Sequence, residues 1–202
     1  MEDILDLYEQ PYDPAQPVVC FDERPCQLIG DVRPSQALAP GRPARQDYEY
    51  ERHGSANVFG YFEPLGGWRR MEVTERRTKH DFARCMRRLV DELCPQAERI
   101  RVVLDNLSTH TKAALYDTFS PAEARRIAAK LELHYTPKHG SWLNAVEMEF
   151  SVLSKQCLDR RIGDIQTLRQ EAQAWDAARN AKAVKLDWQF RTKDAPHQVG
   201  RV

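Results

Sequence analysis

Two short apolar segments, each ending in an aspartate, constrain the fold of this chain most strongly. They are Pro17–Asp22 and Ile100–Asp105, and apolar runs of this length are typical of buried strands. Ligands of open α/β sheets gather beyond the strand ends, in the crevice between neighbouring strands. We therefore expect the carboxylates of Asp22 and Asp105 to share one place if the two strands are neighbours.

The segments around these strands predict one α/β domain. Four proline and glycine residues lie among polar residues between 32 and 47, which indicates a long loop. Further along the chain, the patterns predict a β-hairpin (56–62 and 68–73, with Gly66-Gly67 between), a strand (131–135) and helices over 79–93, 143–159 and 165–180. This order favours a mixed sheet with helices on both faces.

Composition excludes several classes of protein. Thirty basic residues balance thirty acidic ones, so the whole-chain charge neither indicates nor excludes a nucleic-acid partner. Five cysteines without a CxxC pair indicate neither a disulfide framework nor a zinc site. The chain has no apolar run long enough to cross a bilayer and begins with an acidic segment rather than a secretory signal. We expect a cytoplasmic protein without a membrane partner.

Two close carboxylates repel each other unless a cation lies between them or one is protonated. Mg²⁺ suits such a site because it prefers carboxylate oxygens. A third ligand would come from the helix after Tyr135, which carries Glu147 and Glu149. Both glutamates flank the apolar stripe of that helix, so helical periodicity does not choose between them. A strand-end turn residue is the alternative for each aspartate, and a solvated flank for each glutamate.

At this point the sequence resembles a known family. Cys20-Phe-Asp-Glu23, Val-Val-Leu-Asp105-Asn106 with Thr109-His110, and the segment His134 to Glu147, which contains Leu-Asn144-x-x-Glu, are similar to the catalytic segments of DDE transposases. The branch most similar is that of the bacterial insertion-sequence 630 elements, which are related to mariner. The resemblance implies a ribonuclease H-like fold with Asp22, Asp105 and Glu147 as catalytic, metal-binding residues.

The resemblance also implies a reaction. Two Mg²⁺ ions per site, with Mn²⁺ as a substitute, would support in-line displacement at a DNA phosphodiester. Cleavage would free a 3′-hydroxyl, which would then attack a target strand. Asn106 and Asn144 are candidates to bridge the acids, with a turn residue and an early-helix residue as the alternatives. His110 flanks the proposed centre and is a candidate to contact phosphate or orient water, with a surface or turn histidine as the alternative.

Basic residues predict how double-stranded DNA would be held. Between 69 and 88 the chain has eight basic and three acidic residues, a composition that a solvated helix face would also show. Our candidates for DNA contact are Arg69, Arg70, Arg76, Arg77, Lys79, Arg87 and Arg88, together with Lys138 and His139.

We expect a lead-in over residues 1–16, the catalytic domain over 17–190 and a tail over 191–202. Members of the resembled family begin with a helix-turn-helix region, so we expect a separate N-terminal helix-turn-helix polypeptide as one partner. A homodimer on DNA and association with the nucleoid are further expectations from the resemblance. The alternatives are a ribonuclease H-fold repair or recombination nuclease, and an inactive transposase fragment that binds DNA or dimerises.

Overall fold

The computed structural model describes residues 1–33, 36–43, 45 and 47–190. In chain order the elements are α1 (Glu2–Glu9), β1 (Val18–Asp31), β2 (Tyr50–Glu63), β3 (Trp68–Thr74), α2 (Lys79–Arg88), the π-helical turn η1 (Leu89–Leu93), β4 (Ile100–Leu104), α3 (Ala113–Thr118), α4 (Pro121–Lys130), β5 (Leu131–Tyr135), the 3-10 turn η2 (Ser141–Leu143), α5 (Val146–Gln156) and α6 (Ile165–Ala181). The predicted hairpin between β2 and β3 and the three predicted helices are present.

The strands form one mixed sheet in the order β3-β2-β1-β4-β5. β2 pairs antiparallel with β1 and β3, whereas β4 pairs parallel with β1 and β5. Cys20 lies opposite Val103 in the parallel register. Asp22 follows Cys20 by two positions within β1, and Asp105 follows Val103 by two positions, just past the end of β4, so the two aspartates lie at the same level along neighbouring strands.

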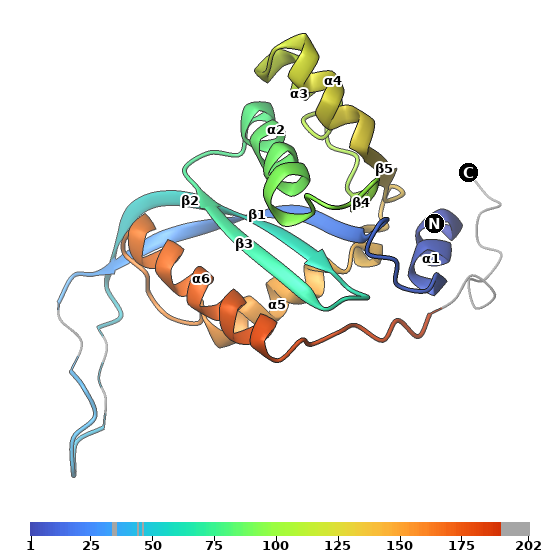
Figure 1. The fold of residues 1–202 in the computed structure, drawn as a ribbon. Helices are drawn as coiled ribbons and strands as arrows, with labels where there is room; N and C mark the ends of the chain where they lie inside the picture. Colours follow the sequence, from blue (N-terminus) through green and yellow to red (C-terminus); the bar gives the residue numbers. More distant parts are fainter. Residues whose placement is uncertain (34–35, 44, 46, 191–202) are drawn as a thin grey trace.

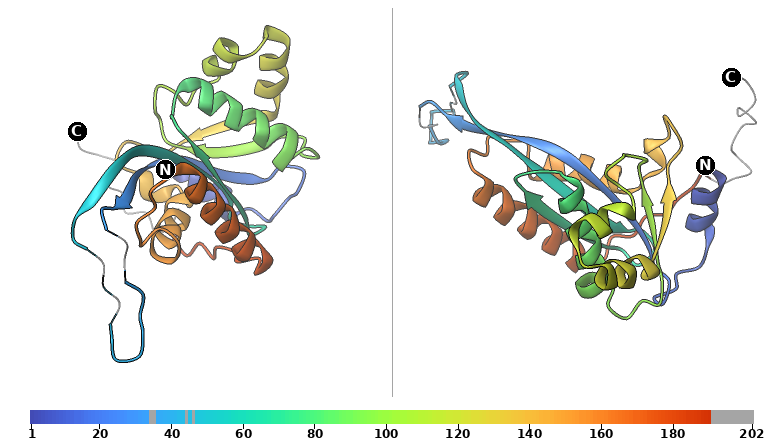
Figure 2. Two further views of the ribbon diagram at one scale, coloured as in Figure 1. Left: turned by 90° about the vertical axis from the view of Figure 1, so that its left-hand side faces the viewer. Right: turned by 90° about the horizontal axis from the view of Figure 1, so that it is seen from above.

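Helices cover both faces of the sheet, as the sequence predicts (Figures 1 and 2). On one face, Val18 and Cys20 of β1 belong to a core with residues of α1, α5 and α6. On the other face, Val19 and Phe21 belong to a core with residues of α2, α3 and α4. Successive side chains of a strand point to opposite faces, so a strand that is buried on both faces contributes alternate residues to two cores. This explains why its sequence is a continuous apolar run.

The segment after Asp22 differs from its prediction. β1 continues to Asp31 and pairs with β2 along most of its length, with an irregularity between Gln27 and Ile29. The loop predicted over 32–47 is the tip of this hairpin, where isolated bridges join Gln36 to Arg45 and Ala39 to Arg42. Figure 2 shows the hairpin extending away from the rest of the molecule. Periodicity missed the extension because its residues are mostly exposed or half-buried, so no apolar face marks it.

The expected lead-in contains a helix that packs on the core. Ile4, Leu5, Leu7 and Tyr8 of α1 are buried against the face that also carries α5. The acidic residues between them hid this apolar face in the sequence. The tail over 191–202 lies outside the described residues. Among the helices of the described ranges, none has the length and hydropathy that a membrane crossing requires.

Candidate active site

The candidate site lies where β4 ends beside β1, at the level of Asp22. Asp22, on β1, is only 7% exposed, and its Oδ1 accepts a hydrogen bond of 2.8 Å from the backbone N–H of Glu23. Asp105 follows the last residue of β4 and its side chain is 29% exposed. The condition set by the sequence analysis is met, because β1 and β4 are direct neighbours, although β1 continues past Asp22 instead of ending there.

Helix α5 brings Glu147 to the same place through a close approach to the sheet. Gly60 of β2 pairs with Asp22 of β1. A Cβ atom on Gly60 would lie 2.8 Å from both the Phe150 ring and a Val146 methyl group. Only a glycine leaves room for α5 at this distance. Glu147 lies in the first turn of α5 and its side chain is exposed. The close packing of α5 on β2 places this turn near the part of β1 that carries Asp22.

Asn144 joins the loop before α5 to β1. Its Nδ2 donates to the backbone oxygen of Phe21 at 2.9 Å and to Asp22 Oδ2 at 3.3 Å. Asn144 is buried, and its Oδ1 has no hydrogen-bond partner among the described residues. The amide therefore orients the Asp22 carboxylate directly, which agrees with the role expected for Asn144.

The pKa of Asp22 reflects the charges around it. Burial and the negative charges of Asp105, Glu147 and Glu23 raise this pKa to about 7, against the hydrogen bond from the Glu23 N–H, which lowers it. A nearby like charge raises the pKa of a carboxyl because it disfavours the ionised form. The charges of both other candidate acids therefore act on Asp22.

His110 holds the second aspartate. Its Nδ1 lies 2.5 Å from Asp105 Oδ1, and its Nε2 lies 3.0 Å from Glu23 Oε2. Burial alone would lower the pKa of His110, but the hydrogen bonds to Asp105 and Glu23 raise it to about 9. The ring also stacks on Phe82 with centroids 4.8 Å apart. A buried imidazolium thus holds Asp105, whereas the sequence analysis expected His110 to contact phosphate or orient water.

Glu23 is a residue of this site that the sequence analysis missed. It follows Asp22, so strand alternation directs it to the opposite face, where His110 lies. Its side chain is 4% exposed. Two adjacent acids at the end of a buried strand were the available signal, because such residues are seldom buried unless they are paired. Asn106, by contrast, is exposed and forms no hydrogen bond to the acids within the described residues.

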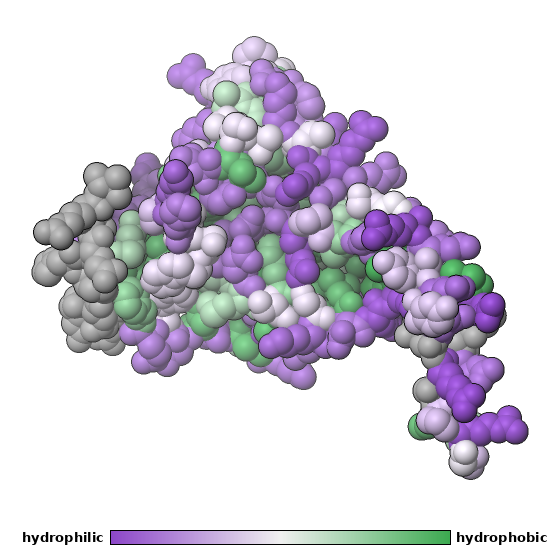
Figure 3. All heavy atoms as spheres, turned by 180° about the vertical axis from the view of Figure 1, so that it is seen from behind, coloured by the Kyte–Doolittle hydropathy of each residue, from purple (hydrophilic) through white to green (hydrophobic). Residues whose placement is uncertain are grey.

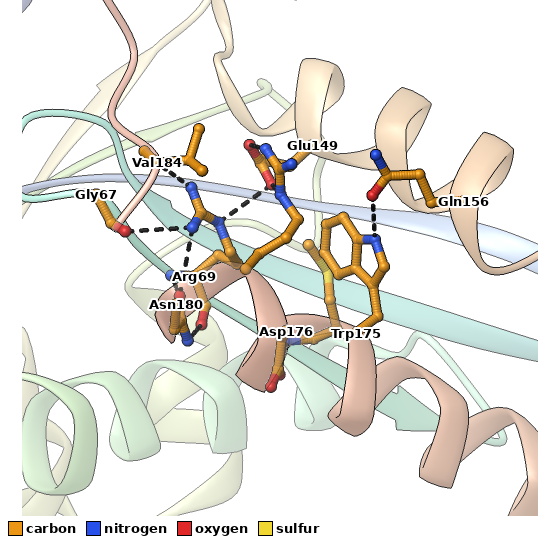
Figure 4. Close-up of polar contacts among 10 residues, drawn as sticks. Gly67, Arg69, Glu149, Gln156, Trp175, Asp176, Asn180 and Val184 are labelled. Atoms are coloured by element: carbon orange, nitrogen blue, oxygen red, sulfur yellow. Dashed lines mark hydrogen bonds and ion pairs between the residues drawn. The ribbon is translucent and has the colours of Figure 1, made fainter. Parts of the chain in front are cut away.

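Glu149 belongs to a different cluster, shown in Figure 4. Arg69 Nε lies 3.1 Å from Glu149 Oε2, and Arg179 of α6 donates to both Glu149 oxygens at 3.0 and 2.8 Å. Arg69 also donates to the backbone oxygens of Gly67 and Val184 at 3.2 and 2.6 Å. The choice that helical periodicity left open is therefore made by packing: Glu149 pairs with two arginines, away from the aspartates.

The prediction of Arg69 as a DNA contact is wrong. Its side chain is fully buried and its guanidinium stacks over the Phe62 ring at 5.0 Å. Strand alternation places Arg69 on the face that α6 covers, where Glu149 compensates its charge. A local count of basic residues does not detect this, because the compensating acid lies far away in sequence.

The comparisons with known proteins bear on this geometry. A family of DDE superfamily endonucleases matches residues 17–169. The chain belongs to this family. The match covers β1, β4 and α5, which carry Asp22, Asp105 and Glu147. No curated protein shows significant similarity to the chain.

Solved structures show the same fold for this DDE superfamily endonuclease. The Mos1 mariner paired-end complex with Mg has a TM-score of 0.60 and 17% sequence identity, over 88% of this chain and 52% of that chain. The Mos1 strand transfer complex has a TM-score of 0.60 and 16% identity, over 88% and 51%. The chain thus spans about half the length of these Mos1 chains, and its sheet order and helix placement are those of a ribonuclease H-like fold.

Most of the basic residues predicted to contact DNA form ion pairs within the endonuclease domain. Arg88 pairs with Glu72 and Glu92, Lys79 with Asp117 at 2.8 Å, Arg87 with Glu123 at 3.6 Å, Arg70 with Asp176 at 3.8 Å and Arg77 with Glu23 at 3.9 Å. Arg76, Lys138 and His139 are exposed. The charge of the 69–88 segment is therefore largely compensated by neighbouring acids.

The carboxylate oxygens of the candidate site are ligands that suit a hard divalent cation, although they are not yet arranged as a ligand cluster. Among the described residues, no three His, Cys, Asp or Glu side chains are already gathered as metal ligands. The charges of Asp105 and Glu147 nevertheless raise the pKa of Asp22, and a cation at this place would offset them. The unpartnered Oδ1 of buried Asn144 adds an oxygen beside them. Asp22, Asp105 and Glu147 are hence the residues that would hold the metal.

Proposed function

We propose that this chain is the catalytic domain of a DDE transposase of the insertion-sequence 630 branch, which cleaves DNA at the ends of an insertion element and transfers the freed strand. The observation that carries the proposal is the parallel pairing of β1 and β4, which brings Asp22 and Asp105 to the same level of the sheet, together with the charges of Asp105 and Glu147, which help burial to raise the pKa of Asp22 to about 7. Membership of the DDE superfamily endonuclease family supports it. The fold shared with Mos1, whose solved structures are a paired-end complex with Mg and a strand transfer complex, supports it further.

In this proposal the acids bind metal and need no nucleophile of their own. Two divalent cations, Mg²⁺ or Mn²⁺, would polarise the phosphodiester and offset the charge that develops on the attacking and leaving oxygens. Water attacks phosphorus, and the bond to the 3′-oxygen breaks to leave a 3′-hydroxyl. That hydroxyl then attacks a phosphodiester of the target strand: a new bond forms between the 3′-oxygen and phosphorus, the bond from phosphorus to the target strand's 3′-oxygen breaks, and that oxygen leaves as a new 3′-hydroxyl. Asn144 orients Asp22, and the His110 imidazolium orients Asp105.

Replacing the acids one at a time tests the proposal. Asp22→Asn, Asp105→Asn and Glu147→Gln should each reduce Mg²⁺-dependent nicking of a labelled duplex to background while the circular dichroism spectrum stays unchanged. Mg²⁺ should raise the melting temperature of the wild-type chain and not that of Asp105→Asn, because only the full set of acids binds the ion. Glu75→Gln, an exposed acid elsewhere, is the control. Cleavage by Asp105→Asn at the wild-type rate would refute the assignment.

Joined products separate transposition from simple cleavage. A repair or recombination nuclease with the same acids leaves cut ends, whereas a transposase also joins a 3′-end to a target duplex. A catalytically inactive DNA-binding or dimerisation module would do neither. Incubating a pre-cleaved end duplex with a supercoiled plasmid, and probing for covalent joining, distinguishes the three.

Partners of the full element-end complex follow from the same proposal. Reading the terminal repeats requires side chains at base edges, which a helix in the major groove normally supplies. We infer a separate helix-turn-helix polypeptide and a homodimer assembled on double-stranded DNA, with the protein associated with the nucleoid. Light scattering of the chain with and without end DNA tests the dimer.

A further inference from the structure

A hollow of about 520 Å³ lies between β1 and α5, and Glu147 is part of its lining. Arg24 lines it from β1, and Ser151 and Lys155 line it from α5. None of these three residues belongs to the basic segment predicted from the sequence. One end of the hollow is therefore acidic and the other is basic.

The placement of these residues follows from the periodicity of the two elements. Glu147, Ser151 and Lys155 are spaced by four residues, so they form one stripe along α5. The stripe extends about 12 Å from Glu147 to Lys155 at 1.5 Å per residue. On β1, Arg24 lies two positions after Asp22 and so on the same face of the strand. Each element thus carries an acid of the candidate site and, further along, a basic residue.

The two basic groups are not compensated by acids. Arg24 is half-buried, and its Nη1 donates to the backbone oxygen of Phe150 at 3.1 Å and to the Ser154 hydroxyl, which are neutral acceptors. Lys155 is exposed. Within the described residues neither forms an ion pair with a carboxylate, unlike Lys79, Arg87 and Arg88. A guanidinium held by neutral partners beside a free ammonium is suited to an anion.

We propose that this hollow binds the phosphodiester backbone of the DNA strand next to the bond that is cleaved, with Arg24 and Lys155 as the phosphate contacts. The inference rests on the DNA cleavage proposed above. Phosphate contacts of this kind set the position and register of the strand and carry no sequence information. Figure 3 shows one face of the molecule, on which groups of hydrophobic residues lie among hydrophilic ones.

Salt-dependent binding tests the phosphate contact. The full chain is titrated onto a fluorescent duplex in EDTA, to prevent cleavage, and anisotropy is measured between 50 and 200 mM salt. Loss of one phosphate contact in Lys155→Ala should lower the slope of log K against log salt by about 0.9 and weaken binding roughly five- to tenfold at 0.1 M salt, on every sequence. Arg125→Ala, an exposed charge on α4, removes the same charge elsewhere and should change neither quantity.

Arg24→Gln is the second variant and should lower the slope by a similar amount, with circular dichroism as the folding check. If Arg24→Gln does not fold, Lys155→Ala decides alone, because its side chain is exposed. If the wild-type chain cleaves DNA but Lys155→Ala keeps the wild-type salt slope, the hollow does not bind the phosphodiester backbone. The proposed function would still stand. Equal losses in Lys155→Ala and Arg125→Ala would also refute the phosphate contacts in the hollow, since binding would then follow total charge. If the wild-type chain neither binds nor cleaves DNA, both the proposed function and the phosphate contacts in the hollow are refuted.

Discussion

Glu147 and Glu149 lie two residues apart on α5, and the structure gives them opposite roles that stability measurements can separate. The Glu149 side chain is 6% exposed and accepts from two guanidinium groups, one of which, that of Arg69, is completely buried. Glu149→Gln removes the only carboxylate paired with Arg69 among the described residues and leaves a positive charge inside the protein. Breaking a buried ion pair on one side typically costs about 3–5 kcal/mol.

We expect Glu149→Gln to lower the free energy of unfolding by about 3–5 kcal/mol, which is a large part of the stability of an ordinary domain. Glu147→Gln, at an exposed position, should change it by less than about 0.5 kcal/mol. Arg179→Gln should cost less than Glu149→Gln, because Arg69 keeps its partner. Urea denaturation followed by tryptophan fluorescence measures all three, with the m-value as the check that unfolding remains two-state.

Glu149→Gln should lose more stability than Glu147→Gln, but it should lose less cleavage activity. Glu149→Gln should retain most cleavage at a temperature where it remains folded, whereas Glu147→Gln should retain none. A loss of stability below about 1 kcal/mol in Glu149→Gln would show that the buried arginine is solvated or compensated otherwise. Cleavage lost in Glu149→Gln and kept in Glu147→Gln would mean that the acids are assigned to the wrong register of α5.

Two further predictions concern the sheet. Burial raises the pKa of Glu63 to about 7, although the hydrogen bonds from the N–H groups of Gly66 and Leu65 lower it. Because the folded chain then binds this proton more tightly than the unfolded chain, the free energy of unfolding falls as pH rises from about 4.5 to about 7. Glu63→Gln should remove up to roughly 3 kcal/mol of that fall, measured by urea denaturation at pH 4.5 and 7.5. A pH dependence identical to wild type would contradict it. Gly60→Ala should destabilise the chain by about 1–3 kcal/mol and reduce cleavage, because the added methyl group displaces α5. If the variant keeps both the melting temperature and the cleavage rate of the wild type, this contact does not hold α5.

The sequence was sufficient to predict the features that local patterns encode. The two apolar runs predicted the buried strands that carry Asp22 and precede Asp105, although β1 continues past Asp22, and Gly66-Gly67 predicted the β2–β3 hairpin. What the patterns did not predict depends on partners distant in sequence. Arg69 looks like a surface charge until Glu149, on a helix about eighty residues later, is packed against it. Glu23 looks like a duplicate of Asp22 until strand alternation turns it toward His110.

The choice between the two glutamates illustrates the limit of periodicity most clearly. Both flank the apolar stripe of α5, so their angles on the helix are equivalent. They differ only in what lies across from them: Glu147 is near the carboxylates of Asp22 and Asp105, and Glu149 is near α6 and β3. That information resides in the packing of α5 between β1 and α6.

The geometry of the acids also depends on a helix that precedes the matched family region. The Tyr8 hydroxyl of α1 lies 3.0 Å from Cys20 Sγ on β1, donates to the Leu143 oxygen at 2.8 Å and accepts from the Ala145 N–H at 3.4 Å. One buried group therefore ties the strand that carries Asp22 to the turn from which α5 and Glu147 start. Asn144 makes a second link between the same two segments through the Phe21 oxygen. In the proposed site these links would hold the strand that carries Asp22 against the segment from which α5 and Glu147 start, so α1 would support the acids although it lies before the matched region.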